Sequence, residues 1–132
     1  MVGIYREVYA DHHYLIGLAL SNLASVYLER KEYTRAEQLY REVIRRYTET
    51  LSPGHLNTAI ARLKLGRALR RQRRYPEAEE SLLASYDTMN KQASPSVSWL
   101  QSARKELATL YDAMNEPEKA KKFRAELGGG KK

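Results

Sequence analysis

Apolar residues along the chain recur at helical spacing, in stretches separated by short polar or proline-containing breaks. Between residues 13 and 30, Ile16, Leu20, Leu23 and Tyr27 follow the order i, i+4, i+7, i+11, which places them on one face of a helix. Nowhere does a run of β-branched or aromatic residues alternate strictly with polar ones, as a half-buried strand requires. The pattern therefore predicts an all-α chain.

The breaks group the predicted helices into three hairpins. Strong breaks at Ser52–Gly54 and at Ser94–Pro95 separate the hairpins, and the second offers a serine N-cap followed by proline. Residues 1–10 have apolar side chains at i and i+4, and we expect them to form a partial helix that is the tail of a preceding repeat. The six full helices are expected at residues 13–30, 34–50, 55–72, 76–91, 95–114 and 117–127.

The three hairpins repeat one pattern at an offset of 42 residues. Several columns that share one register across three copies indicate a structural repeat. We assign the repeats to residues 11–52, 53–94 and 95–127, and expect residues 128–132 to be a flexible tail. Gly66 costs its helix about 1 kcal/mol relative to alanine, so we expect it to allow close packing. The aligned columns are Ala19, Ala61 and Ala103; Ala24, Gly66 and Ala108; Tyr27, Leu69 and Tyr111; Ala36, Ala78 and Ala120.

The repeated segments NLASVYLERKEYTRAEQLYREVI, KLGRALRRQRRYPEAEESLLAS and ELATLYDAMNEPEKAKKFRAEL resemble tetratricopeptide repeats. The long period and the linker LSPGHLNTA are similar to the kinesin light chain type of repeat. The last segment is similar to repeat arrays at the C-terminal ends of bacterial serine/threonine kinases. The resemblance implies a right-handed superhelical stack of three antiparallel helical hairpins, an α-solenoid that binds protein partners.

The two ends of the predicted stack differ. Arg124 takes the position that Tyr40 and Leu82 occupy in the first two repeats, where the second helix packs on the following repeat. A charge there indicates that the third repeat is a C-terminal cap. At the other end, residues 14–18 leave little polar surface on the first full helix. We expect a further part of a longer array, or self-association, to cover this end.

Composition and charge narrow the class of protein. The 132 residues, 42% apolar and 30% charged, suit one soluble globular domain. The sequence has no apolar run of about 18 residues, no secretion signal at its start and no cysteine. We therefore expect a cytoplasmic protein without membrane insertion, and the net charge of +7 favours an acidic partner.

A basic run from Arg62 to Arg74 is the most distinctive chemistry, with seven cations and no acid. Lys64, Arg67, Arg71 and Arg74 follow helical spacing and are predicted to form one stripe. Because arginine binds carboxylates and phosphates through paired hydrogen bonds, the stripe favours an acidic or phosphorylated peptide. The alternative is a solvated face whose cations pair with neighbouring acids.

The family resemblance implies that a ligand lies along the concave face built by the first helix of each hairpin. The expected function is non-catalytic protein–protein interaction, within a larger signalling protein such as a bacterial serine/threonine kinase. The alternatives are a nucleic-acid-binding repeat domain and a scaffold that forms homodimers through its N-terminal end. Carried over to this sequence, the groove residues are Asn22, Ser25, Lys64, Arg67, Arg70, Arg71, Lys105 and Thr109.

No set of residues predicts catalysis, a metal or a cofactor. The sequence has no glycine-rich phosphate loop, no nucleophile with a partnered base and no kinase motif. His12, His13 and His55 lack an accompanying carboxylate cluster, so we interpret them as capping or surface residues. The chain is therefore expected not to be an enzyme.

Overall fold

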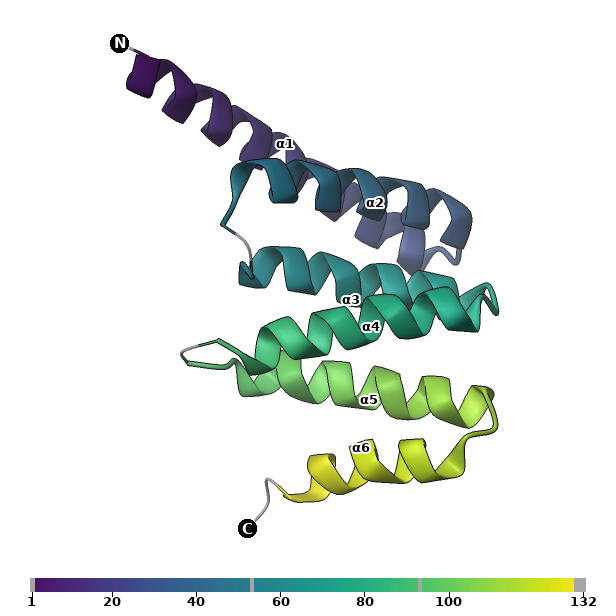
Figure 1. Cartoon of the computed structure of the whole chain (residues 1–132). Helices are drawn as coiled ribbons and strands as arrows, with labels where there is room; N and C mark the ends of the chain where they lie inside the picture. The colour runs from purple at the N-terminus through teal and green to yellow at the C-terminus, as the bar shows by residue number, and fades with distance from the viewer. Residues whose placement is uncertain (1, 53, 93, 130–132) are drawn as a thin grey trace.

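The computed structural model describes residues 2–52, 54–92 and 94–129, and the side chains of residues 14–52, 54–92 and 94–127. These residues contain no strand, so the all-α prediction is confirmed. Figure 1 shows the helices stacked in chain order, with α1 at one end and α6 at the other. The six helices are α1 (Val2–Glu29), α2 (Tyr33–Thr50), α3 (Leu56–Arg71), α4 (Tyr75–Asn90), α5 (Val97–Ala113) and α6 (Pro117–Gly129).

Consecutive helices pack as three hairpins, α1–α2, α3–α4 and α5–α6, and the hairpins join through α2–α3 and α4–α5 (Figure 1). The first helices of the hairpins, α1, α3 and α5, also contact one another in succession. Among the described residues, α2, α4 and α6 have no close backbone contact with each other. The stack therefore curves around α1, α3 and α5, which we call the inner wall. The predicted helical solenoid is confirmed.

The turn inside each hairpin has one backbone conformation, repeated at the 42-residue offset. Lys31, Arg73 and Asn115 have φ angles of 65°, 64° and 59°, in the left-handed region. In each turn the following residue donates its N–H to the carbonyl five residues earlier, which closes a Schellman motif. The sequence repeat is thus a repeat of backbone geometry. These bonds run from Glu32 to Tyr27, from Arg74 to Leu69 and from Glu116 to Tyr111, at 2.9, 3.0 and 2.8 Å.

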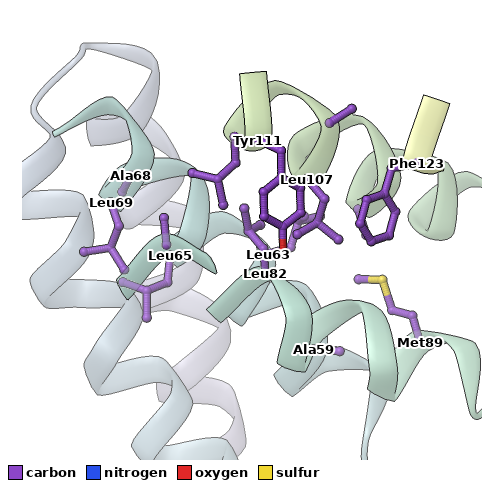
Figure 2. Close-up of a cluster of buried hydrophobic side chains, with 14 of the residues drawn as sticks. Ala59, Leu63, Leu65, Ala68, Leu69, Leu82, Met89, Leu107, Tyr111 and Phe123 are labelled. Atoms are coloured by element: carbon purple, nitrogen blue, oxygen red, sulfur yellow. The ribbon is translucent and has the colours of Figure 1, made fainter. Parts of the chain in front are cut away.

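Close packing between α3 and α4 explains Gly66. A Cβ atom on Gly66 would lie 2.5 Å from Cγ and 2.7 Å from Cδ2 of Leu82. Leu82 is fully buried and has little room to move aside. Figure 2 shows this core, in which Leu82 lies among side chains that include Leu63 and Leu107. The expectation that Gly66 permits close packing is confirmed.

The first helix is longer than predicted. Residues 2–10 are helical, but they continue into α1 instead of forming a separate partial helix. No proline or turn sequence separates them from residue 13, so one hydrogen-bond ladder runs from Val2 to Glu29. Their assignment to a preceding repeat stays a prediction.

Two other boundaries differ from the prediction by more than one residue. The N-cap of α5 is Ser96, not Ser94, and its Oγ accepts a hydrogen bond from the backbone N–H of Trp99 at 3.4 Å. Ser96 has extended backbone angles, so the helix begins immediately after it and Pro95 stays in the linker. At the other end, α6 includes Gly128 and Gly129 of the predicted tail, whereas residues 130–132 lie outside the described part of the chain.

Candidate functional site

The inner wall brings the predicted groove residues together on three neighbouring helices. Asn22 and Ser25 come from α1, four cations from α3, and Lys105 and Thr109 from α5. Four members of this set are exposed: Asn22, Arg71, Lys105 and Thr109. The other four are partly buried and make contacts within the protein: Ser25, Lys64, Arg67 and Arg70.

Glu106 of α5 neutralises part of the basic run on α3. Arg67 donates from Nε to Oε2 of Glu106 at 2.6 Å, and Arg70 donates to Oε1 at 3.1 Å. The side chains of Arg70 and Glu106 are only 15% and 13% exposed, so water screens this contact less than a surface ion pair. Two guanidinium groups on one carboxylate hold α3 against α5 and leave one positive charge in excess.

Lys64 belongs to a polar chain that links α3, α1 and α2. Its Nζ donates to Oγ of Ser25 at 3.4 Å, and Ser25 Oγ in turn lies 2.9 Å from the hydroxyl of Tyr40. Partial burial and the neighbouring Arg67 lower the pKa of Lys64. Burial raises the pKa of Tyr40, although the Ser25 hydrogen bond acts in the opposite direction. Ser25 and Lys64 therefore satisfy buried polar groups of the fold, in addition to lining the inner wall.

Arg71 is the exposed arginine of the inner wall. It has no hydrogen bond or ion pair with any described residue. Together with Arg67 and Lys31 it lines a hollow of about 270 Å³, whose apolar side is formed by Leu28 and Tyr33. Glu29 is the only acid in this lining. The volume suits one acidic side chain or phosphoryl group better than a drug-sized molecule.

Arg74 does not continue the stripe on α3. The helix ends at Arg71, and the left-handed residue Arg73 turns the chain, so that Arg74 becomes the N-cap of α4. There its guanidinium donates to Glu37 and Glu77. The prediction of one helical stripe with four cations is therefore wrong in its last member, because the helical spacing was extended past the end of the helix.

Glu106 was not predicted as a counterion. It occupies the repeat column of Asn22 and Lys64, so the sequence does place opposite charges at equivalent positions of α3 and α5. The column does not reveal that one carboxylate reaches both Arg67 and Arg70, because that depends on how closely α3 and α5 approach.

A second hollow, also not predicted, lies between α2, α3 and α4, and has a volume of about 580 Å³. Its apolar lining comes from Ile44, Leu65, Leu69 and Ala84. Arg62 lines this hollow, so the first cation of the basic run lies apart from Arg71. The basic run is therefore distributed over several surfaces of the repeat.

The described residues contain neither a metal-ligand cluster nor a helix that is long and apolar enough to cross a membrane. His55 is the N-cap of α3, and its Nδ1 accepts a hydrogen bond from the backbone N–H of Asn57 at 3.0 Å. Its interpretation as a capping residue is confirmed. The side chains of His12 and His13 lie outside the described residues.

Comparison with known proteins agrees with this geometry at the level of the family. The family model described as tetratricopeptide repeat matches residues 15–91, more than half of the chain. The match extends from α1 to the end of α4 and so covers the first two hairpins. Among curated proteins, none matches the sequence.

Proposed function

This chain belongs to the tetratricopeptide repeat family, and we propose that its inner wall binds an acidic or phosphorylated segment of a partner protein. Repeats of this family generally act as protein–protein interaction modules. The observation that carries the proposal is Arg71, an exposed guanidinium with no partner among the described residues, beside a hollow that Lys31 and Arg67 also line.

The charges around Arg71 favour an anionic ligand. Arg67 and Arg70 share the single carboxylate of Glu106, while Lys105 is exposed on the next helix of the wall. A carboxylate or phosphate can therefore bind Arg71 through charge-assisted hydrogen bonds without breaking an existing ion pair. The net charge of +7 also steers anionic partners toward the protein.

Uncharged polar residues extend this surface on both sides of α3. Asn22 on α1 and Thr109 on α5 are exposed, and each can both donate and accept a hydrogen bond. A peptide that crosses the wall from α1 to α5 would present its backbone N–H and C=O groups to these side chains. In the proposed complex, Arg71 thus selects the charge of the ligand, and Asn22 and Thr109 bind its backbone.

Fluorescence anisotropy tests this proposal with a labelled peptide that contains glutamate and phosphoserine, compared with the same peptide carrying glutamine and serine. We expect only the charged peptide to bind. Arg71→Glu should weaken its binding at least tenfold, since hydrogen bonds to charged groups contribute about 1.5–3 kcal/mol. Lys121→Glu is the matched control, because Lys121 is an exposed cation on α6, outside the inner wall, and the change in net charge is identical.

Two outcomes would overturn the proposal. Equal losses for Arg71→Glu and Lys121→Glu would mean that net charge, and not a site on the inner wall, attracts the peptide. Failure of the charged peptide to bind, together with binding of a labelled single-stranded oligonucleotide whose affinity falls steeply with salt, would favour nucleic acid as the partner.

Three further statements stay predictions from the sequence. They are the likeness to kinesin light chain repeats, a place in a larger signalling protein such as a bacterial kinase, and a cytoplasmic location. The proposed binding surface depends on none of them, since it is argued from contacts within residues 22–109.

A further inference from the structure

α1 has an apolar face that no described helix covers. Leu15, Leu23 and Val26 are 61%, 43% and 43% exposed, and Ala19 between them is also exposed. Their spacing of i, i+4, i+8 and i+11 places them on one face of the helix. Among the described residues, α1 packs only on α2 and α3. We call these four residues the α1 stripe.

Three of the four stripe positions are buried in the other two repeats. In those repeats the second helix of the preceding hairpin covers them, α2 on α3 and α4 on α5. The α1 stripe therefore has the composition of a helix–helix interface, but none of the described helices covers it. The three positions are those of Ala19, Leu23 and Val26, and the equivalent residues at the 42-residue offset are each at most 6% exposed. These are Ala61, Leu65 and Ala68 in α3, and Ala103, Leu107 and Leu110 in α5.

The opposite end of the stack is unsuited to cover this stripe in a second copy. On α6, Arg124 occupies the column of the buried residues Tyr40 and Leu82, and its side chain is 54% exposed and paired with Asp112. Head-to-tail stacking would bury this ion pair against apolar side chains, at a desolvation cost. A symmetric contact, in which the same surface of both copies meets, avoids this cost.

The length of α1 suits such a symmetric contact. α1 has 28 residues and α2 has 18, and Figure 1 shows the N-terminal part of α1 extending beyond the end of α2. Tyr14 still contacts Tyr47, near the end of α2, with ring centroids 5.8 Å apart. Leu15, the most exposed member of the stripe, lies at the middle of α1.

We propose that two copies of this chain associate through antiparallel α1 helices, related by a twofold axis near Leu15. This arrangement overlaps the two helices along their whole length. The N-terminal half of each α1 then lies over Ala19, Leu23 and Val26 of the other copy. It supplies the helix that α2 and α4 supply in the later repeats, and the proposal does not depend on the ligand of the inner wall.

Disulfide trapping tests the geometry directly, because the chain contains no cysteine. Under mild oxidation Leu15→Cys should form a covalent dimer, since the twofold axis brings the two copies of this residue together. Val26→Cys should not, because the antiparallel helices separate the two copies of residue 26 by about 33 Å. Val97→Cys is the control, since Val97 is 70% exposed on α5, away from the stripe.

Light scattering and sedimentation at several concentrations test the association without a cross-link. The mass of the unmodified chain should rise with concentration from 15.2 kDa toward twice that value. Leu23→Glu should stay monomeric with unchanged helical circular dichroism, while Val97→Glu should dimerise like the unmodified chain. A monomeric mass at every concentration, or efficient trapping through Val26→Cys, would overturn the antiparallel α1 dimer.

Discussion

We call the contact between the first two repeats the first joint, and the contact between the last two repeats the second joint. One column of carboxylates makes different contacts in the two joints. In the first joint, Glu37 of α2 accepts hydrogen bonds from Gln72 and Arg74 of the next repeat. In the second joint, the equivalent Glu79 of α4 accepts one hydrogen bond, from the hydroxyl of Tyr111 at 2.7 Å. At this column the first joint therefore has a charged network and the second a neutral donor. The charges of the second joint lie instead on the inner wall, where Arg67 and Arg70 meet Glu106.

Around Glu79, the second joint has aromatic packing where the first joint has charged donors. Phe123 of α6 stacks on Tyr111 with centroids 6.0 Å apart and meets the edge of Tyr86 at 5.5 Å. In the first joint, Ile44 and Leu69 occupy the columns of Tyr86 and Tyr111. Repeats with the same backbone geometry thus accept different side-chain chemistry. The substitutions that destabilise the protein most should therefore differ between the two joints.

The largest expected loss of stability comes from removing an aromatic side chain at the second joint. Phe123→Ala should destabilise the protein by about 3–5 kcal/mol, because Phe123 is only 5% exposed and the deletion leaves a cavity between α5 and α6. Urea unfolding followed by circular dichroism measures this loss. Phe123→Leu, which keeps most of the volume, should cost much less; a similar cost for both variants would mean that packing is not what holds α6.

Removal of the carboxylate should affect the first joint more than the second. Glu37→Ala leaves Gln72 and Arg74 without a shared acceptor and should cost about 1–3 kcal/mol, whereas Glu79→Ala should cost about 1 kcal/mol. Both variants can be compared by chemical denaturation at neutral pH. Equal costs would remove the proposed distinction between charged donors on Glu37 and a neutral donor on Glu79.

The two joints should also lose stability at opposite ends of the pH range, the first in acid through Glu37 and the second in alkali through Tyr111. Burial raises the pKa of Glu37, but hydrogen bonds from Gln72, Arg41 and Arg74 outweigh it, and the net effect lowers the pKa. Its stabilisation is therefore complete above the unfolded-state value of about 4.3 and is lost as the pH falls through the lower folded-state value. Glu37→Gln should flatten the acid limb of the stability curve.

The alkaline limb depends on Tyr111. Burial, followed by the hydrogen bond to Glu79, raises its pKa. Its stabilisation is complete below the unfolded-state value of about 10 and is lost as the pH rises from there toward the folded-state value. Tyr111→Phe should cost about 1 kcal/mol at neutral pH and flatten the alkaline limb, which thermal melts from pH 7 to pH 11 would show.

The smallest expected effect concerns the turns that precede α4 and α6. Arg73 and Asn115 both have positive φ, but asparagine tolerates this conformation better than arginine. Arg73→Gly should therefore stabilise the protein by up to about 1 kcal/mol, and Asn115→Gly by less. Denaturation midpoints measure the difference, and a loss of stability for Arg73→Gly would contradict this account of the turn.

The sequence by itself determined the helices, their period and the closely packed positions. Small residues recur in the columns of Gly66 and Ala78 because each repeat forms the same local hydrogen bonds and packs its two helices at the same buried positions. Such features are periodic along the chain, so a sequence reveals them without knowledge of the fold. The family follows from the same columns.

Only the tertiary structure decided how the charges are distributed. Arg67 and Arg70 meet Glu106 across two repeats, and Arg74 leaves the stripe because a left-handed turn ends α3 before it. These contacts depend on the distance between helices that are far apart in sequence and on the direction of one turn. Helical spacing contains neither quantity, which is why the sequence identified the basic run but not the arginine that stays exposed, Arg71.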